Sequence, residues 1–288
     1  MKKIAIVISS FCGKLDEEIV QAGMYSVPLQ LQIENEQWLE GFYSQEEKHT
    51  IVNKFTSANN FSTSLPPLAL MIEQMEKLTQ EYEQVLYLPI DAQLSATCNT
   101  LKNYAKDHPN VTVFNNHLSG SALFHAGLEC KRLYEEEGKS MEEILAFLND
   151  FNDKTIGYII PKELKTFIKS GRLKGIKKVL LTSINLALMI EVGNILKTAG
   201  IARNKKSAVN KVVNRLLEFI KTKNLQPEDV DFTLIYAYNQ EIGNLIEEAL
   251  KQQGISLTYN EESSLATMMH TGYGATYIGI NPKIKKEA

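Results

Sequence analysis

Short polar motifs at three places in the sequence are suited to binding an anion. Thr63-Ser64 precedes a helix that Pro66-Pro67 is expected to open, and Ser95 with Thr97 opens a helix after a predicted strand. The third motif is His-Thr-Gly-Tyr-Gly-Ala at 270–275, whose two glycines let the backbone approach a ligand closely. Hydroxyls, an imidazole and helix N-termini supply the donors that a carboxylate or phosphate needs.

Each motif also has a purely structural interpretation. A serine or threonine at a helix start, such as Ser64 or Ser95, more often caps its own helix than binds a ligand. The segment with His270, Thr271 and Gly272 is equally consistent with a polar turn before the last strand. Taken singly, these residues leave capping and ligand binding open.

A fourth group of residues is basic. Only four of the 31 basic residues are arginine, and two of these four, Arg172 and Arg203, lie in the runs 170–172 and 202–206. Because the guanidinium group suits bidentate contacts to anions, these runs are candidates for docking an anionic partner. A solvated basic rim is the structural alternative.

Signatures of catalysis and of metal binding are missing from the sequence. There is no glycine-rich nucleotide loop, no HExxH and no GxSxG motif. His117 and His125 are two helical turns apart, but two histidines are too few to form a metal site. The cysteines at 12, 98 and 130 show no CxxC spacing. We therefore expect neither a cofactor nor a metal.

The elements that must position these motifs alternate between strand and helix in the first half of the chain. Apolar runs at Ile4–Ser9, Val85–Ile90 and Val111–Asn115 predict buried strands, and the alternating run Val27–Ile33 predicts a half-exposed one. Helical patterns separate these runs, which predicts a parallel sheet with helices on both faces. Loops at the carboxyl ends of such strands form the binding crevice.

The second half of the chain reads as a mixed α/β domain. Gly193-Asn194 between two apolar runs predicts a two-residue hairpin turn, and Ile255–Tyr259 and Tyr277–Ile280 predict further strands. A polar run near 150–155 marks a break. We therefore predict an N-terminal α/β domain over 1–152 and a C-terminal α/β domain over 153–288.

Composition excludes several classes of protein. With 31 basic and 34 acidic residues the net charge is -3, so the chain is not a general binder of nucleic acid. The longest apolar stretch, 179–192, is 14 residues long, whereas a membrane span needs about 20. We expect a cytoplasmic protein without a transmembrane segment, and transient contact with a membrane stays open.

The order and spacing of these motifs resemble the DegV family of fatty-acid-binding proteins, which includes the FakB-type subunits of bacterial fatty acid kinase. The resemblance extends over about residues 3–281. The family motifs T-S-Q-P-S, S-S-G-L-S-G-T, G-G-R-I and H-T-G-P-G-A match, in this order, residues 63–67, 91–97, 170–173 and 270–275.

The resemblance implies a two-domain DegV-like fold, also called the EDD fold, with a long-chain fatty acid bound between the domains. In such a protein the carboxylate is presented to a kinase subunit, which makes the acyl phosphate, and the binding protein itself performs no chemistry. Arg172 and Arg203 would serve the entrance or the kinase-docking face. The ligand-binding residues carried over are Thr63, Ser64, Ser95, Thr97, Arg172, His270, Thr271 and Gly272.

The sequence also departs from the family pattern. The family's D-S-T after the first strand is Ser9-Ser10-Phe11, and its first Ser-Ser-Gly is replaced by Asp91-Ala92-Gln93. Two other functions therefore stay open. One is a carrier of another small anion without a kinase partner, and the other is an acyl hydrolase with Ser95 as nucleophile and His270 as base.

Overall fold

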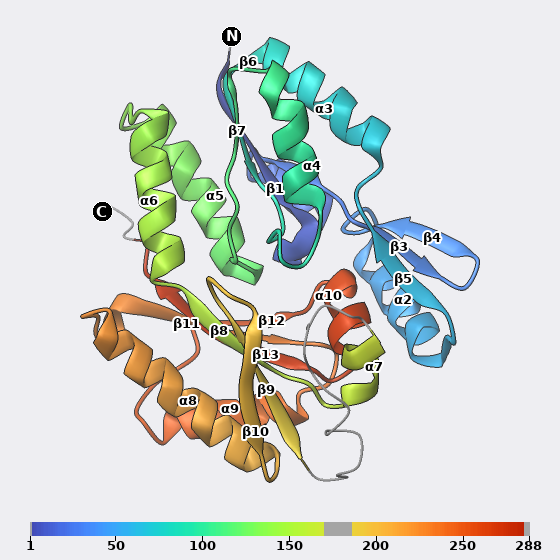
Figure 1. Ribbon diagram of the computed structural model, residues 1–288, viewed down its shortest axis with the longest axis vertical. Helices are drawn as coiled ribbons and strands as arrows, with labels where there is room; N and C mark the ends of the chain where they lie inside the picture. The colour runs from blue at the N-terminus through green and yellow to red at the C-terminus, as the bar shows by residue number, and fades with distance from the viewer. Residues whose placement is uncertain (1, 170–185, 285–288) are drawn as a thin grey trace. The chain divides into compact units, whose positions relative to one another are not determined.

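The computed structural model describes residues 2–169 and 186–284 and divides into two compact units. The first unit is Met1–Asp150 with Ser264–Ala266, and the second is Phe151–Ser263 with Thr267–Ala288. Each unit has its own sheets and its own helices (Figure 1). Arg172 and its neighbours Ser170 and Gly171 lie outside the described residues.

A four-stranded parallel sheet forms the centre of the first unit, in the order β2-β1-β6-β7. Its strands are β1 (Lys2–Ser9), β2 (Tyr25–Val27), β6 (Tyr82–Leu88) and β7 (Val111–Val113). The apolar runs of β1 and β6 are buried, as expected of strands covered on both faces. The parallel sheet predicted from Ile4–Ser9, Val85–Ile90 and Val111–Asn115 is confirmed, and the last two strands end two residues earlier than predicted.

Helices pack against this sheet on both faces. α3 (Leu68–Glu81) and α4 (Thr97–Tyr104) bury apolar side chains against alternate strand residues such as Val7 and Tyr87. α5 (Gly120–Glu135) lies on the other face, where Gly127 allows close packing: a Cβ at this position would lie 3.0 Å from Cγ2 of Ile8. α4 and α5 each follow the carboxyl end of a strand, so their N-termini lie at the same edge of the sheet.

The single strand predicted at Val27–Ile33 is wrong, because the chain changes sheet at Pro28. Proline has no N–H to donate to a strand partner, and the N–H of Leu29 donates to Oγ of Ser10 at 3.1 Å. β2 therefore ends at Val27, and the following residues join a second, antiparallel sheet with the order β4-β3-β5. Its strands are β3 (Gln30–Ile33), β4 (Glu36–Leu39) and β5 (Phe61–Ser64).

α2 (Gln45–Ser57) shows how local residues fix a helix start in this unit. Oγ of Ser44 accepts the N–H of Glu47 at 3.2 Å, and Oε2 of Glu47 accepts the N–H of Ser44 at 2.8 Å. This reciprocal capping box satisfies two of the free donors of the first turn. The chain also forms α1 (Asp16–Gln21), α6 (Met141–Asp153), η1 (Ser10–Cys12) and η2 (Ala105–Asp107).

The second unit contains a six-stranded mixed sheet, which confirms the predicted class of the C-terminal part. Its strands, in spatial order, are β10 (Lys197–Ala202), β9 (Ala187–Val192), β8 (Ile156–Ile160), β13 (Thr276–Pro282), β11 (Val230–Tyr236) and β12 (Tyr259–Glu262). Only β11 and β12 pair in parallel among these strands. α8 (Lys205–Thr222) and α9 (Glu241–Lys251) cover one face with a large apolar core (Figure 1).

Three predictions in this unit need correction. The hairpin of β9 and β10 exists, but Glu191 pairs with Lys197, so the turn is longer than two residues. Neither Gly193 nor Asn194 adopts the positive φ that a two-residue turn of type I′ requires. The strand predicted at Ile255–Tyr259 begins only at Tyr259.

The third correction concerns the segment before β13, which forms a helix, α10 (Leu265–Thr271), where the sequence predicts a polar turn. The unit also contains α7 (Leu164–Lys169) and η4 (Pro227–Asp229). Among the described residues, no helix is both long enough and apolar enough to cross a bilayer.

Candidate ligand-binding site

The strand order of the parallel sheet creates a switch point between β1 and β6. After β1 the chain forms β2 on one side, whereas β6 pairs with the other side of β1. In open α/β sheets the binding crevice lies outside the carboxyl ends of the strands at such a point. Here these ends lead into η1 and into the turn at 89–96 before α4, which contains Ser95.

Ser95 and Thr97 form a hydroxyl pair at the start of α4. Their Oγ and Oγ1 atoms are 2.9 Å apart, and Oγ of Ser95 also accepts the N–H of Thr97 at 3.3 Å. Ser95 is half-buried and Thr97 is buried. Each hydroxyl has one hydrogen to donate, and the bond between them uses only one. The second hydrogen is available to a ligand.

Asp91, which replaces a small residue of the family motif, holds this turn in place. Its Oδ1 accepts the N–H of Gln93 at 2.8 Å, and its Oδ2 accepts Nε2 of Gln93 at 3.1 Å. Its carbonyl oxygen accepts the N–H groups of Leu94 and Ser95. The buried carboxylate is thus bonded within its own turn, which orients Ser95.

Two asparagines after β7 also hold this turn in place. Oδ1 of Asn115 accepts the N–H of Ala92 at 2.9 Å, and Nδ2 of Asn116 donates to the carbonyl oxygen of Pro89 at 2.9 Å. These amides join the loop after β7 to the turn after β6. The two loops that border the carboxyl ends of these strands therefore form one hydrogen-bonded structure.

Thr63 and Ser64 lie at a different kind of position from the one predicted. They are the last two residues of β5, where they pair with Leu31 and Gln30 of β3. α3 begins after Pro67, which provides no side-chain hydrogen bond to the helix. The two hydroxyls are therefore strand residues and do not cap α3.

An open groove of about 740 Å³ runs between the β5–α3 connection and α4 in the first unit. Ser64 lines it together with the apolar side chains of Leu65, Leu68 and Met71. Nε2 of Gln30, which also lines the groove, donates to the carbonyl oxygen of Leu65 at 2.7 Å and fixes this connection. The remaining lining residues are Pro66, Asn99, Thr100, Asn103 and Tyr104.

His270 and Thr271 end α10 in the second unit, where the sequence suggested a polar turn. Oγ1 of Thr271 donates to the carbonyl oxygen of Thr267 at 2.9 Å, so its hydrogen is used within the helix. Gly272 ends the helix with a φ of 92°, and its N–H donates to the carbonyl oxygen of Met268 at 2.8 Å. His270 is half-buried in the last turn.

Backbone contacts fix the rest of this loop. The N–H of Gly274 donates to the carbonyl oxygen of Ala237 at 2.7 Å, and the N–H of Ala237 donates to the carbonyl oxygen of Ala275 at 2.8 Å. Gly274 has a φ of 80°, and a Cβ at this position would lie 2.5 Å from Cδ of Lys162. The glycine is therefore needed both for its backbone conformation and for close packing.

Comparisons with known proteins identify the family. The family model described as "Uncharacterised protein, DegV family" matches residues 3–283. The chain belongs to the DegV family. A DegV domain-containing protein of Mycoplasma genitalium is 24% identical over 296 residues, which cover 97% of this chain and 98% of the relative.

Solved structures agree with this assignment. A fatty-acid-binding DegV family protein from Streptococcus agalactiae has a TM-score of 0.83 at 20% identity and covers 99% of this chain and 100% of its own. A stearic-acid-binding protein from Eubacterium ventriosum has a TM-score of 0.80 at 18% identity and covers 98% of this chain and 99% of its own. The predicted DegV fold is therefore confirmed.

The ligand-binding residues predicted for this DegV chain fall into local groups. Ser95 and Thr97 share one hydrogen-bonded turn, and Thr63 and Ser64 share one strand end, all in the first unit. The α10 loop with His270, Thr271 and Gly272 belongs to the second unit, and Arg172 lies outside the described residues.

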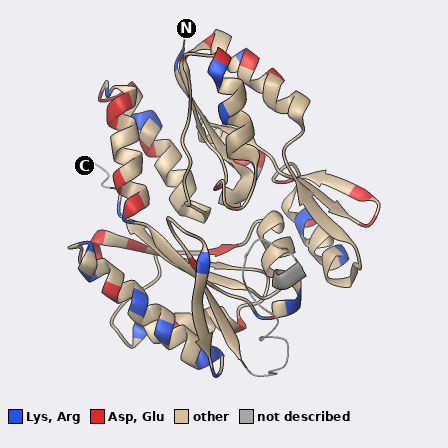
Figure 2. Cartoon of the chain, viewed as in Figure 1, with Lys and Arg blue, Asp and Glu red and all other residues tan. Residues whose placement is uncertain are grey.

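Arg203, the other predicted docking residue, is exposed and lies two residues before α8 of the DegV chain. Figure 2 shows basic residues recurring along this helix, and Lys206 and Lys211 are also exposed. Nζ of Lys205 is 2.8 Å from a carboxylate oxygen of Glu241, so its charge is compensated. The exposed side of α8 near Arg203 is therefore positively charged.

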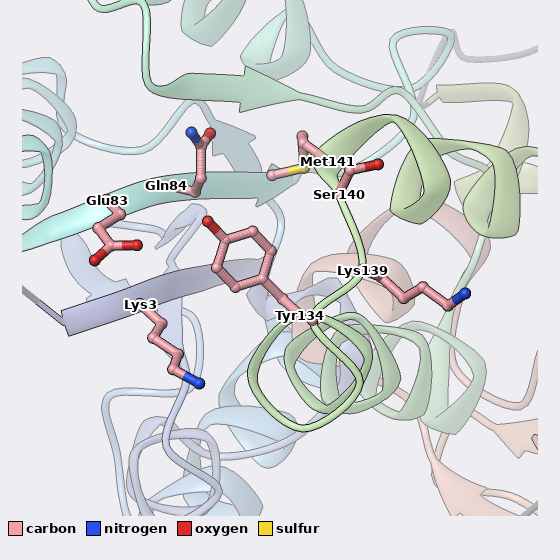
Figure 3. Close-up of a pocket in the computed structure, with 8 residues that line it drawn as sticks. Lys3, Glu83, Gln84, Tyr134, Lys139, Ser140 and Met141 are labelled. Carbon is pink, nitrogen blue, oxygen red and sulfur yellow. The ribbon is translucent and has the colours of Figure 1, made fainter.

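A second cavity, of about 390 Å³, lies at the amino ends of β1 and β6, at the opposite edge of the sheet from Ser95 (Figure 3). Its lysines are already bonded: Lys3 donates to the carbonyl oxygen of Glu135 at 2.8 Å, and Lys139 to a carboxylate oxygen of Glu143 at 3.0 Å. This cavity therefore lies apart from the predicted site, and Glu143 compensates the charge of Lys139.

The described part of the DegV chain offers little support for metal binding or for a cysteine or serine nucleophile. Residues 2–169 and 186–284 contain no group of three or more His, Cys, Asp or Glu side chains arranged to bind a metal. Burial raises the pKa of the Cys98 and Cys130 thiols, which disfavours the nucleophilic thiolate. The side-chain hydrogen bonds of Ser95 join it to the hydroxyl and the N–H of Thr97, neither of which acts as a base.

Proposed function

We propose that this DegV chain binds a long-chain fatty acid and presents its carboxylate to a partner kinase, which forms the acyl phosphate. The observation that carries the proposal is the hydroxyl pair of Ser95 and Thr97 at the carboxyl end of β6. The structurally similar DegV family protein from Streptococcus agalactiae is described as fatty-acid-binding, and the structurally similar protein from Eubacterium ventriosum as stearic-acid-binding. In this proposal the chain itself performs no chemistry.

The start of α4 suits a carboxylate for two physical reasons. One hydrogen of the Ser95–Thr97 pair is free to donate, and a hydrogen bond to a charged oxygen is stronger than one to a neutral atom. The N-terminal end of a helix also favours negative charge. Thr63 is proposed as a second donor, and His270 as a donor that acts directly or through water.

The acyl chain would supply most of the affinity. Burying hydrocarbon contributes about 0.8 kcal/mol per methylene group, so a long chain outweighs a few hydrogen bonds. The polar residues would then set the orientation of the ligand, with the carboxylate towards Ser95. A short-chain acid with the same carboxylate is expected to bind much more weakly.

Arg203, together with Arg172, is proposed to dock the kinase. The positive charge of Arg203, Lys206 and Lys211 suits an acidic partner surface, which would speed association and depend on salt. Replacing Arg203 with Ala should weaken the complex with a cognate kinase subunit and leave fatty acid binding unchanged. If the variant binds the kinase as well as the natural chain does, this docking role is wrong.

Native mass spectrometry of the purified chain is the first test. We expect a mass increment that matches one fatty acid, identified after extraction. A protein that carries no lipid and does not bind added fatty acid would contradict the proposal and favour a carrier of another small anion. An ester-hydrolysis activity that Ser95→Ala abolishes would instead favour the hydrolase.

A pair of serine variants separates ligand binding from helix capping. Both Ser95 and Ser44 accept an N–H at a helix start, but only Ser44 is the N-cap of its helix, so Ser44→Ala should cost about 1 kcal/mol of stability and Ser95→Ala less. Only Ser95→Ala should also weaken fatty acid binding. Equal affinities of the two variants would show that Ser95 has a structural role alone.

A further inference from the structure

Glu40 is a buried carboxylate that no part of the proposed function uses. It directly follows β4, and only 2% of its surface is exposed. A buried charge is costly unless other groups compensate it, so its contacts indicate what the residue does.

Three donors and one cation surround this carboxylate. Oε2 accepts the N–H of Ala266 at 2.6 Å, and Oε1 accepts the N–H of Leu265 at 3.3 Å. The hydroxyl of Tyr43 donates to Oε1 as well. Lys48 of α2, which is also buried, provides the compensating positive charge.

These contacts fix the start of α10. The first N–H groups of a helix have no partner within the helix, and Glu40 accepts two of them, one on each oxygen. Because the carboxylate is planar, two such bonds define the direction of the helix axis as well as its position. Ser264–Ala266 belongs to the first unit, although Leu265 is 225 residues from Glu40 in the chain.

We propose that Glu40 is a positioning residue for His270 in ligand binding, a role that rests on the proposed function. His270 is four residues after Ala266 in α10, so the two lie on the same side of the helix about one turn apart. A change in the direction of α10 at Leu265 therefore moves the imidazole. Glu40 itself does not touch the ligand in this proposal.

Glu40→Gln removes the charge and one of the two acceptor oxygens. The affinity for palmitic acid should fall about tenfold, since hydrogen bonds to charged groups in proteins are among the stronger ones. The imidazole NMR signals of His270, assigned with His270→Ala, should also shift in the ligand-free protein. A destabilised core without an effect on α10 would not move these signals selectively.

A double-mutant cycle shows whether Glu40 acts through His270. Once His270 is replaced by Ala, the further change Glu40→Gln should weaken binding less than twofold. With Ser95→Ala in place of His270→Ala, the full tenfold effect should remain. Equal effects in the two backgrounds would overturn the proposal.

Glu34→Gln serves as a control, and Tyr43→Phe is a substitute if Glu40→Gln does not fold. Oε1 of Glu34 accepts the N–H groups of Asn59 and Asn60 at 2.7 and 3.0 Å, so Glu34→Gln removes the charge of an exposed carboxylate that also accepts two backbone N–H groups, away from α10. It should leave the His270 signals unchanged. If Glu40→Gln does not fold, Tyr43→Phe removes one donor to the same carboxylate and should shift the His270 signals less.

Binding of palmitic acid by the natural chain and by the Glu40→Gln variant distinguishes a wrong role for Glu40 from a wrong proposed function. A natural chain that binds palmitic acid, with a Glu40→Gln variant that binds it equally well and leaves the His270 signals unchanged, overturns the role of Glu40 alone. A natural chain that binds no fatty acid overturns the function on which that role rests.

Discussion

Replacing Gly274 with Ala tests whether the loop after α10 is fixed by close backbone packing. At a φ of 80° an L side chain costs about 1–2 kcal/mol. The new Cβ would also lie 2.5 Å from Cδ and 3.2 Å from Cβ of Lys162, and 3.4 Å from Cβ of Asn239. Overpacking of this kind costs about 1–3 kcal/mol, and the mobile end of the lysine keeps the cost in the lower part of that range. The expected loss of stability is about 2–4 kcal/mol.

Gly254 provides the matched control within the same unit. Its φ is 72°, but a Cβ there would meet no atom within 4 Å. Gly254→Ala should therefore lower the stability only by the cost of placing an L residue at a positive φ, about 1–2 kcal/mol. Urea unfolding measures both variants, with the free energies compared at an unchanged m-value.

The difference between the two variants decides the prediction. Gly274→Ala should be the more destabilised variant, and it alone should weaken fatty acid binding, because the loop lies next to His270. Equal stabilities would refute the steric argument. A destabilised Gly274→Ala variant with natural affinity would refute the link between the loop and the ligand.

Three other predictions concern separate parts of the chain. Gly157→Ala would place Cβ 2.1 Å from the Tyr277 ring, so it should cost about 1–3 kcal/mol in urea unfolding. The loss should be smaller in a Tyr277→Ala background, and equal losses would contradict the contact. Burial raises the pKa of the Glu40 carboxyl, so the folded state holds its proton more tightly than the unfolded state, in which a glutamate has a pKa of about 4.3. The contribution of Glu40 to the free energy of unfolding should therefore fall as pH rises from that value through the folded pKa, and a Glu40→Gln variant with the same pH slope as the natural chain would contradict this. Arg203→Ala should leave the melting temperature unchanged and reduce the salt dependence of kinase association, and an unchanged salt dependence would contradict its docking role.

The parallel sheet could be predicted because strands covered on both faces are apolar along their whole length. Ile4–Ser9 shows this pattern, and the strand formed there is buried on both faces. The antiparallel sheet could not be predicted, because β4 and β5 are short and mostly polar, and because the apolar alternation of Val27–Ile33 continues across Pro28. Alternation alone does not show at which residue a chain leaves one sheet for another.

In the candidate site, features that depend on neighbouring residues could be predicted, and features that depend on distant contacts could not. Ser95 could be located because a hydroxyl before a helix is a pattern of neighbouring residues. α10 does have a helical pattern in the sequence: Leu265, Ala266, Met268 and Met269 are apolar at helical spacing, and all are buried. The contact of Glu40 with α10 has no such pattern, because its partners at Leu265 and Ala266 are more than 200 residues away and are backbone N–H groups. No side-chain pattern encodes such a contact.

In the structure, the contact of Ser95 with its own helix is compatible with ligand binding. From the sequence, capping and ligand binding are alternatives for Ser95, and capping is the more common role. In the structure, Oγ of Ser95 accepts the N–H of Thr97, which uses a lone pair, whereas a carboxylate would use a hydroxyl hydrogen of the pair. The contact with the helix therefore uses a lone pair of the Ser95 oxygen, and ligand binding would use a hydroxyl hydrogen. This turn contact therefore holds the hydroxyls at the helix start, just before the N-cap Ala96, where the dipole of α4 also favours a carboxylate.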